Sequence, residues 1–159
     1  MRSDDPALPR RTKLPHEPPT WVSENAIYFV TVCTVPRGAN QLCRPSVGGR
    51  LIEAALYRER VLSQWSVHLL LLMPDHVHML LSVAGPIELA RCVTGWKRYT
   101  ACRLGVRWQR DFFEHRLRRD ESLEQKADYI LHNPVRAGLT SEPDGWPYVW
   151  QNLRRLTGG

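Results

Sequence analysis

Two apolar segments separated by only two residues constrain the fold of this chain most. Residues 66–73 contain four consecutive leucines, and residues 76–83 follow directly after Pro74-Asp75. A short polar connection between two strand-like segments is typical of an antiparallel β-hairpin. The leucine run also indicates a strand that is buried on both of its faces.

Further strands and helices are predicted on either side of the hairpin. A segment rich in β-branched and aromatic residues indicates a strand, and apolar periodicity predicts helices. Pro86 suits the first turn of one helix, and Pro134 disfavours the continuation of another. The expected elements are a strand at 28–34, a helix at 50–64, the hairpin strands, a helix at 87–103, a strand at 108–117, a helix from about 123 to 133, and an irregular tail over 136–159.

The order β-α-β-β-α-β predicts an α+β protein with a ferredoxin-like sandwich, in which two helices cover one face of an antiparallel sheet. The additional C-terminal helix either covers the other face or leaves it free to carry chemistry. We divide the chain into an arm at 1–20, which holds five of the twelve prolines, a folded domain at 21–140, and a tail at 141–159 that packs on the domain.

The composition bounds the class of protein. The 159 residues are 43% hydrophobic and 24% charged, as expected for one globular domain. Neither a membrane-spanning apolar run nor an apolar leader is evident, so we expect a cytoplasmic protein without a membrane partner. The wide spacing of the cysteines favours reduced thiols over a zinc site. These cysteines are Cys33, Cys43, Cys92 and Cys102.

Positive charge is concentrated in one segment. The whole chain has a net charge of +6, whereas residues 91–119 alone hold nine cationic and two acidic side chains, a net charge of +7. Arginine dominates over lysine there, which favours bidentate phosphate contacts and indicates nucleic acid as the partner. The alternative is a solvated basic face. Trp96 and Tyr99 are candidates to stack on unpaired bases, although Trp96 is an equally good core residue.

His76 and His78 carry the strongest chemical signal. Residues i and i+2 of a strand point to the same face, so both imidazoles lie together on the face opposite Val77 and Met79. Two neighbouring imidazoles suit one divalent metal ion. A metal site for catalysis also needs a third ligand and an open position for substrate.

The last predicted helix offers the missing groups. Tyr129 and Asn133 stand at i and i+4, one turn apart on one helix face. The Asn133 carbonyl oxygen can bind a hard cation such as Mg²⁺ or Mn²⁺, and a nearby cation would favour the phenolate of Tyr129 as a nucleophile. Taken singly, Tyr129 is equally consistent with a core aromatic, and Asn133 with a helix C-terminal residue before Pro134.

Taken together, these residues resemble the HUH single-tyrosine transposases, and most closely the REP-associated tyrosine transposases. The resemblance covers residues 10–150 in the family's order. The matching segments are Leu14-Pro15-His16, Tyr28-Phe29-Val30-Thr31, Met73-Pro74-Asp75-His76-Val77-His78, Trp108-Gln109-Arg110-Asp111-Phe112-Phe113 and Tyr129-Ile130-Leu131-His132-Asn133-Pro134-Val135-Arg136-Ala137-Gly138-Leu139.

The resemblance implies a metal-dependent enzyme that nicks and transfers single-stranded DNA at palindromic REP-like hairpins. His76, His78 and Asn133 would hold Mg²⁺ or Mn²⁺, and Tyr129 would form a 5′-phosphotyrosine bond. It also implies a bacterial protein located at the nucleoid, which acts as a monomer, with a dimer as the alternative. Basic side chains would hold the DNA, namely Arg10, Arg11, Lys13, Arg91, Lys97, Arg98, Arg103, Arg107 and Arg110.

Two other functions remain open at this stage. A module that binds DNA hairpins without cutting them needs only the basic segment. A metal hydrolase that activates water would need a general base, and Asp75 is the one carboxylate that the sequence places near the histidines.

Overall fold

A computed structural model describes residues 26–118 and 120–156. The predicted arm, including Arg10, Arg11 and Lys13, lies outside the described residues. The elements follow in the order β1 (Ala26–Cys33), α1 (Gly48–Arg60), β2 (Ser66–Met73), β3 (His76–Val83), α2 (Pro86–Leu104), β4 (Phe113–Arg116), α3 (Leu123–Leu131), α4 (Asn133–Arg136), the 3-10 turn η1 (Pro143–Gly145), β5 (Val149–Gln151) and the 3-10 turn η2 (Leu153–Leu156).

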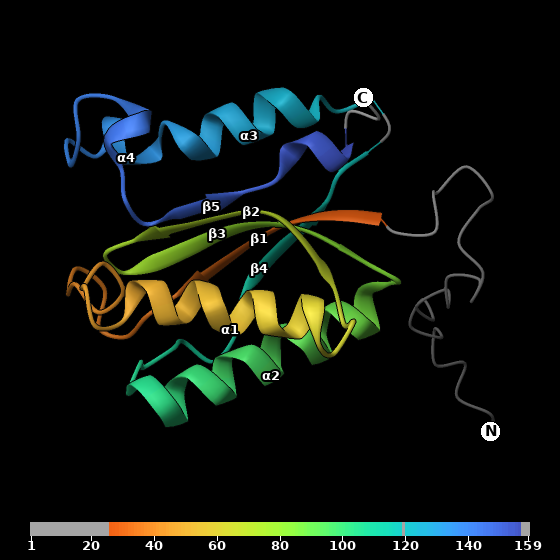
Figure 1. The fold of residues 1–159 in the computed structure, drawn as a ribbon, viewed down its shortest axis with the longest axis horizontal. Helices are drawn as coiled ribbons and strands as arrows, with labels where there is room; N and C mark the ends of the chain where they lie inside the picture. The colour runs from red at the N-terminus through yellow and green to blue at the C-terminus, as the bar shows by residue number, and fades with distance from the viewer. Residues whose placement is uncertain (1–25, 119, 157–159) are drawn as a thin grey trace, which may run out of the picture.

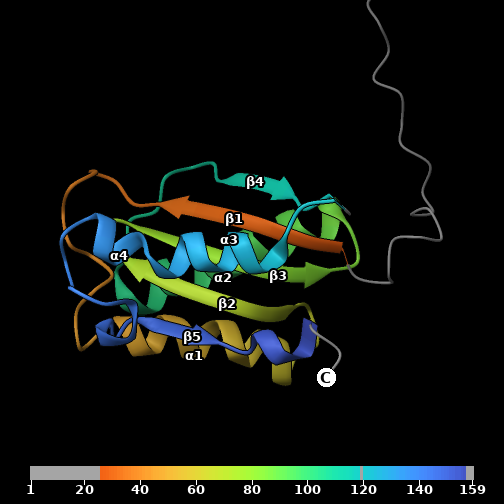
Figure 2. The same ribbon diagram turned by 90° about the horizontal axis from the view of Figure 1, so that it is seen from above.

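The strands form one five-stranded antiparallel sheet in the order β4-β1-β3-β2-β5 (Figure 2). The predicted hairpin is confirmed, because β2 and β3 pair directly across the turn at Pro74-Asp75. β3 lies in the middle of the sheet and also pairs with β1 along its full length. The α+β class with an antiparallel sheet is therefore confirmed.

Alternation along the strands sends side chains into two separate apolar layers. On one face, Val77, Met79 and Leu81 of β3 pack with α1 and α2. On the other face, Leu80 packs with leucines of β2 and with residues of α3. The run of four leucines in β2 is divided between the two layers, as the predicted burial on both faces requires. Figure 1 shows the sheet between these two helical layers.

The layer of α1 and α2 is the larger core. α2 has a proline in its first turn and ends at Gly105, whose φ of 71° is the left-handed conformation common after a helix. Trp96 of this helix is fully buried, and its Nε1 donates a hydrogen bond of 3.3 Å to the Leu51 carbonyl. Base stacking by Trp96, one of its two expected roles, is therefore wrong.

The second layer consists of α3 with the segments around it. α3 begins after Ser122, whose hydroxyl accepts a hydrogen bond of 3.2 Å from the Gln125 N–H. Ala127 and Ile130 then point into the cluster on the sheet. The further helix therefore covers the second face, which was one of the two alternatives.

Three predicted boundaries are corrected by the structure. The strand expected at 108–117 forms a ladder only over β4, with a single bridge between Trp108 and Thr34 before it, and the carbonyls of Gln109 and Arg110 accept hydrogen bonds from Lys97 Nζ. The tail expected to be irregular contributes β5, which pairs with β2. The last helix ends at Leu131, and α4 starts separately at Asn133, because Pro134 has no N–H to continue the ladder.

β5 has a clear physical role in the sheet. Without it, β2 would be an edge strand with unpaired backbone groups. Besides the ladder, the Trp146 indole donates a hydrogen bond of 2.9 Å to the Leu72 carbonyl, and the Leu72 N–H donates to the Tyr148 carbonyl. Sequence periodicity missed this strand because three residues are too few to show alternation.

Within residues 26–118 and 120–156, no helix has the length and apolar character needed to cross a membrane. All four cysteines are free thiols, as expected. Burial raises the pKa of the Cys43 thiol to about 12, so this group is protonated at neutral pH.

Docking of α3 on the sheet can be tested by truncating its buried anchor. Ile130 is fully buried, so Ile130→Ala should lower the free energy of unfolding by about 2–4 kcal/mol. Gln125→Ala, on the exposed side of the same helix, should change it by less than about 0.5 kcal/mol. Urea unfolding measures both values. Equal effects for the two variants would contradict the docking of α3.

Candidate active site

The histidine pair lies where β3 begins, on the face of the sheet that α3 covers. The ring centroids of His76 and His78 are 4.7 Å apart, so the two imidazoles lie together as predicted. His78 is buried with 8% of its surface exposed, and its ring stacks on Phe29 of β1 at 5.4 Å. His76 is half-buried, closer to the end of the sheet. The pair therefore faces away from the larger core.

Each imidazole is held by a hydrogen bond through its Nδ1 atom. His76 Nδ1 lies 2.8 Å from Asp75 Oδ1, and His78 Nδ1 lies 2.8 Å from the Thr31 hydroxyl. Thr31 is directly opposite His78 in the β1–β3 ladder. Because an ionised carboxylate only accepts, His76 carries its proton on Nδ1 and leaves the lone pair of Nε2 available. A carboxylate–histidine pair of this kind commonly orients metal ligands.

His78 is neutral at neutral pH. Burial lowers its pKa from 6.5 to about 3, and the neighbouring His76 and Arg136 act in the same direction. A cation that binds this imidazole therefore does not have to displace a proton.

The Asp75 carboxylate accepts several hydrogen bonds at the hairpin turn. Besides His76, it accepts hydrogen bonds from Arg37 Nε at 2.9 Å and from the Gly38 N–H at 2.8 Å. Burial raises its pKa, but the hydrogen bonds from Arg37, His76 and Gly38 outweigh burial and hold the pKa well below its usual range. A carboxylate this acidic is a poor general base.

Tyr129 lies on α3 beside the inward-facing Ile130, with 57% of its own surface exposed. Arg136 of α4 folds back on it. The guanidinium carbon lies 4.1 Å from the centre of the Tyr129 ring, and Nη2 donates a hydrogen bond of 2.5 Å to the Tyr129 carbonyl. Arg136 therefore contacts the tyrosine and also acts electrostatically on His78.

Asn133 is half-buried and is the first residue of α4. The i, i+4 argument assumed one continuous helix through Tyr129 and Asn133, whereas the chain breaks at His132 between α3 and α4. His132 Nδ1 contacts the Asp128 carbonyl at 2.8 Å on the exposed side. The role of Asn133 as a ligand stays a prediction.

The donor groups can be compared with what a divalent cation needs. In the described part of the chain, no three His, Cys, Asp or Glu side chains come together to hold a metal ion. The His76 and His78 nitrogens suit a divalent ion that accepts mixed N and O ligands, and the Asn133 amide oxygen stays the third donor that the sequence predicts. Because both Nδ1 atoms are already engaged, the residues fit such an ion through their Nε2 atoms.

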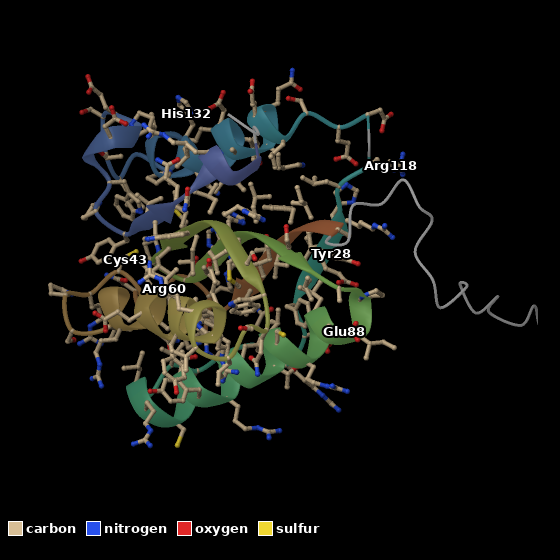
Figure 3. All side chains as sticks on the ribbon, turned by 45° about the vertical axis from the view of Figure 1, so that its right-hand side comes forward. Tyr28, Cys43, Arg60, Glu88, Arg118 and His132 are labelled. Carbon is tan, nitrogen blue, oxygen red and sulfur yellow. The ribbon has the colours of Figure 1, made fainter. Side chains whose placement is uncertain are left out.

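The predicted DNA-binding side chains of α2 lie on the opposite side of the sheet from the histidine pair. Figure 3 shows Arg60 of α1 and Glu88 of α2 on one side and His132, beside α3, on the other. Lys97 is turned inward onto two carbonyls, and burial lowers its pKa. The other basic residues are exposed, namely Arg91, Arg98, Arg103, Arg107 and Arg110.

Arg107 and Arg110 nevertheless lie at the same end of the sheet as the histidines. The Arg107 carbonyl accepts a hydrogen bond from the Val35 N–H, and the neighbouring Gln109 N–H donates to the Cys33 carbonyl. Cys33 is the register partner of His76. This end of the sheet therefore joins part of the basic segment to the predicted metal site.

Three residues of this site were not predicted from the sequence. Thr31 and Arg136 both lie within the matching segments, but only the strand register and the turn into α4 bring them to His78 and Tyr129. Asp75 was considered only as a base. Its role in orienting the His76 ring could have been expected from its position directly before His76 in the sequence.

Comparison with known proteins was made by sequence and by structure. No family model matches the chain. A REP-associated tyrosine transposase from Escherichia coli is 30% identical over 48% of this chain and 48% of its own length. A protein of Haemophilus influenzae named for the same family is 33% identical over 48% of this chain and 53% of its own length. Over about half of its length, the chain is therefore similar in sequence to REP-associated tyrosine transposases. It spans about half the length of these curated relatives.

Solved structures share the fold. The structure of a REP-associated tyrosine transposase bound to a REP hairpin superimposes with a TM-score of 0.66 at 23% identity, over 84% of this chain and 81% of the other. A crystal structure named as a transposase from Deinococcus radiodurans gives a TM-score of 0.50 at 18% identity, over 71% of this chain and 91% of the other.

The buried state of His78 predicts a pH dependence of stability. Below pH 6.5 the unfolded chain binds a proton at this residue and the folded chain does not, because the folded pKa is about 3. In the presence of a chelator, the free energy of unfolding should fall from pH 6.5 towards pH 3, with a limiting slope from this residue of about 1.4 kcal/mol per pH unit.

The contribution of His78 can be isolated by comparing variants. Urea unfolding at pH 7 and pH 5 should show a smaller pH effect for His78→Gln than for the wild type. His132→Gln, at an exposed residue, should keep the wild-type effect. A wild-type slope in the His78→Gln protein would show that His78 is protonated in the folded state.

Proposed function

We propose that the chain is a metal-dependent enzyme that nicks and rejoins single-stranded DNA at REP-like hairpins, with Tyr129 as its nucleophile. The observation that carries the proposal is the contact between α3, the helix of Tyr129, and the aromatic ring on which His78 stacks. Lys126 Nζ of α3 lies 5.2 Å from the centre of the Phe29 ring, and Phe29 stacks on His78 at 5.4 Å, so the tyrosine helix packs beside the histidine pair.

The architecture is consistent with this class of enzyme. The element order through β4 and the strand order β4-β1-β3-β2 are those of a ferredoxin-like sandwich, with β5 added at one edge. In this arrangement α1 and α2 cover one face, and the helix that carries the nucleophile covers the other. His76 and His78 then lie in β3, the middle strand, which is paired on both sides.

The metal ligands proposed are His76, His78 and Asn133, with Mg²⁺ or Mn²⁺ as the cation. When bound, the cation would polarise a phosphate oxygen and offset the negative charge that develops during cleavage. Asp75 and Thr31 orient the two imidazoles through Nδ1. The His78 ring is further held by stacking on Phe29.

The covalent step proposed is transfer of a phosphoryl ester to Tyr129. The phenolate oxygen attacks the scissile phosphorus, a P–O bond to tyrosine forms, and the bond to the 3′ oxygen breaks. The departing oxygen takes up a proton as a free 3′-hydroxyl, and the 5′ side stays attached to the protein. A 3′-hydroxyl can reverse this step without an energy-rich cofactor, because the phosphodiester energy is conserved in the phosphotyrosine bond.

Support for the DNA substrate comes from charge and from the relatives. The solved relative of this fold is bound to a REP hairpin. In this chain, exposed arginines are available for the DNA backbone. The proposed contacts are Arg10, Arg11 and Lys13 of the arm, and Arg91, Arg98, Arg103, Arg107 and Arg110, with Lys97 holding the segment that carries Arg110.

The decisive test is a covalent adduct between the protein and labelled single-stranded hairpin DNA in the presence of Mn²⁺. Denaturing gels should show the adduct for the wild type, its loss in Tyr129→Phe, and its loss with a chelator. Tyr148→Phe is the matched control, since the half-buried Tyr148 keeps its contact with Trp146 as phenylalanine. Cleavage that persists in Tyr129→Phe would show that another group is the nucleophile.

Arg136 should affect the rate of adduct formation rather than the affinity for DNA. Arg136→Ala removes the contact with the Tyr129 ring and its hydrogen bond, so the single-turnover rate should fall on the order of tenfold. Arg136→Lys should recover part of the rate because the charge remains. Arg60→Ala, at an exposed arginine of α1, should keep the wild-type rate. A loss of DNA affinity alone would contradict the positioning role of Arg136.

The second candidate function is a hairpin-binding module without cleavage, which the exposed basic residues alone would support. It predicts binding that falls with salt, is unaffected by a chelator, and yields no adduct.

The contacts of Asp75 argue against a hydrolase that uses this carboxylate as the base, because its proton affinity is too low.

A further inference from the structure

A cleft between α1 and α2 lies outside the proposed active site. Its volume is about 270 Å³. α1 contributes Arg50 and Tyr57, and α2 contributes Tyr99 and Arg103. Glu53 is the one acidic residue that lines it.

Hydrogen bonds join α1 and α2 at two places, and the Trp96 indole of α2 makes one of them to the Leu51 carbonyl of α1. Arg58 of α1 donates a hydrogen bond of 2.9 Å to the Gly95 carbonyl of α2. A side chain at Gly95 would meet the Arg58 guanidinium at 3.1 Å, so glycine permits this close approach. Towards the start of α1 and the end of α2, the cleft separates the helices.

The side chains of the cleft have the chemistry of a nucleotide site. Tyr57 and Tyr99 are large aromatic residues with 54% and 48% of their surfaces exposed. Exposed aromatic faces stack on unpaired bases, and arginines bind the adjoining phosphates. The two arginines outnumber the one glutamate, so the lining attracts an anion.

The location of the cleft favours DNA that also reaches the histidine pair. Arg103 lies in the last turn of α2, and Arg107 follows it in the chain. Arg107 is hydrogen-bonded to the segments beside the hairpin turn, through the Val35 N–H and the Gln41 side chain. Exposed arginines thus continue from the cleft around the end of the sheet towards His76.

We propose that this cleft binds unpaired nucleotides that extend from the DNA hairpin, with the bases on Tyr57 and Tyr99 and the phosphates on Arg50 and Arg103. The inference rests on the proposed function only in taking single-stranded DNA as the ligand. It assigns Arg50 and Tyr57 to DNA binding. It also predicts that single-stranded DNA binds along α2, on the face of the sheet opposite the histidine pair.

The test measures binding without cleavage, using Tyr129→Phe protein and no divalent metal. Fluorescence anisotropy compares a labelled blunt hairpin with the same hairpin carrying a single-stranded extension at its 5′ or its 3′ end. The Tyr57→Ala/Tyr99→Ala variant should lose on the order of 10- to 100-fold in affinity for one extended hairpin, as expected for two lost stacking contacts. Its affinity for the blunt hairpin should change less than twofold.

Matched variants separate the cleft from general surface effects. Arg50→Ala should weaken binding of the same extended hairpin, whereas Arg60→Ala, which removes an exposed charge from the same helix outside the cleft, should not weaken it selectively. Ile87→Ala is the control for loss of an exposed apolar side chain from α2. Thermal unfolding should show that all variants fold.

The outcomes distinguish this inference from the proposed function. Equal losses for blunt and extended hairpins, or no loss for either, would overturn the cleft as a single-strand site even if the wild type forms its adduct. Selective loss for the extended hairpin supports the cleft even if no adduct is ever found. Binding of free mononucleotides that is lost in the tyrosine variant, without any effect of the extension, would also overturn the proposal.

Discussion

The structure depends on burial of β3 from both sides. This strand pairs with β1 and β2 along its length, and its side chains alternate between two apolar layers. One layer needs α1 and α2, and the other needs α3. Because both layers share one strand, a change in its register would exchange their side chains and disrupt both. The sheet can therefore hold a catalytic group in a fixed position.

The candidate site lies at the start of β3, at the end of the apolar layer under α3. His78 is buried like its apolar neighbours, but Thr31 and Phe29 from the adjacent strand supply a hydrogen bond and a stacking partner. A buried polar group without such partners would be costly. The same burial keeps the imidazole neutral, which is the form that binds a cation.

Arg136 and Asp75 extend the site beyond the histidine pair. Asp75 joins the hairpin turn to Arg37 and Gly38 in the preceding loop while it orients His76. Arg136 caps the Tyr129 carbonyl, close to the break that Pro134 makes between α3 and α4. The helix break and the tyrosine contact are therefore parts of one local arrangement, and a continuous helix would not place Arg136 in the same way.

Sequence alone determined the hairpin, the face of the two histidines and the presence of two helical segments around it. These features follow from local patterns, such as alternation, proline positions and turn residues, which act between near neighbours. Tertiary structure decided the burial of Trp96, the pairing of β5 with β2, the inward turn of Lys97 and the contact of Arg136 with Tyr129. Each of these depends on which elements meet in space and on the groups that need a partner there, and residue patterns along the chain carry little information about such meetings.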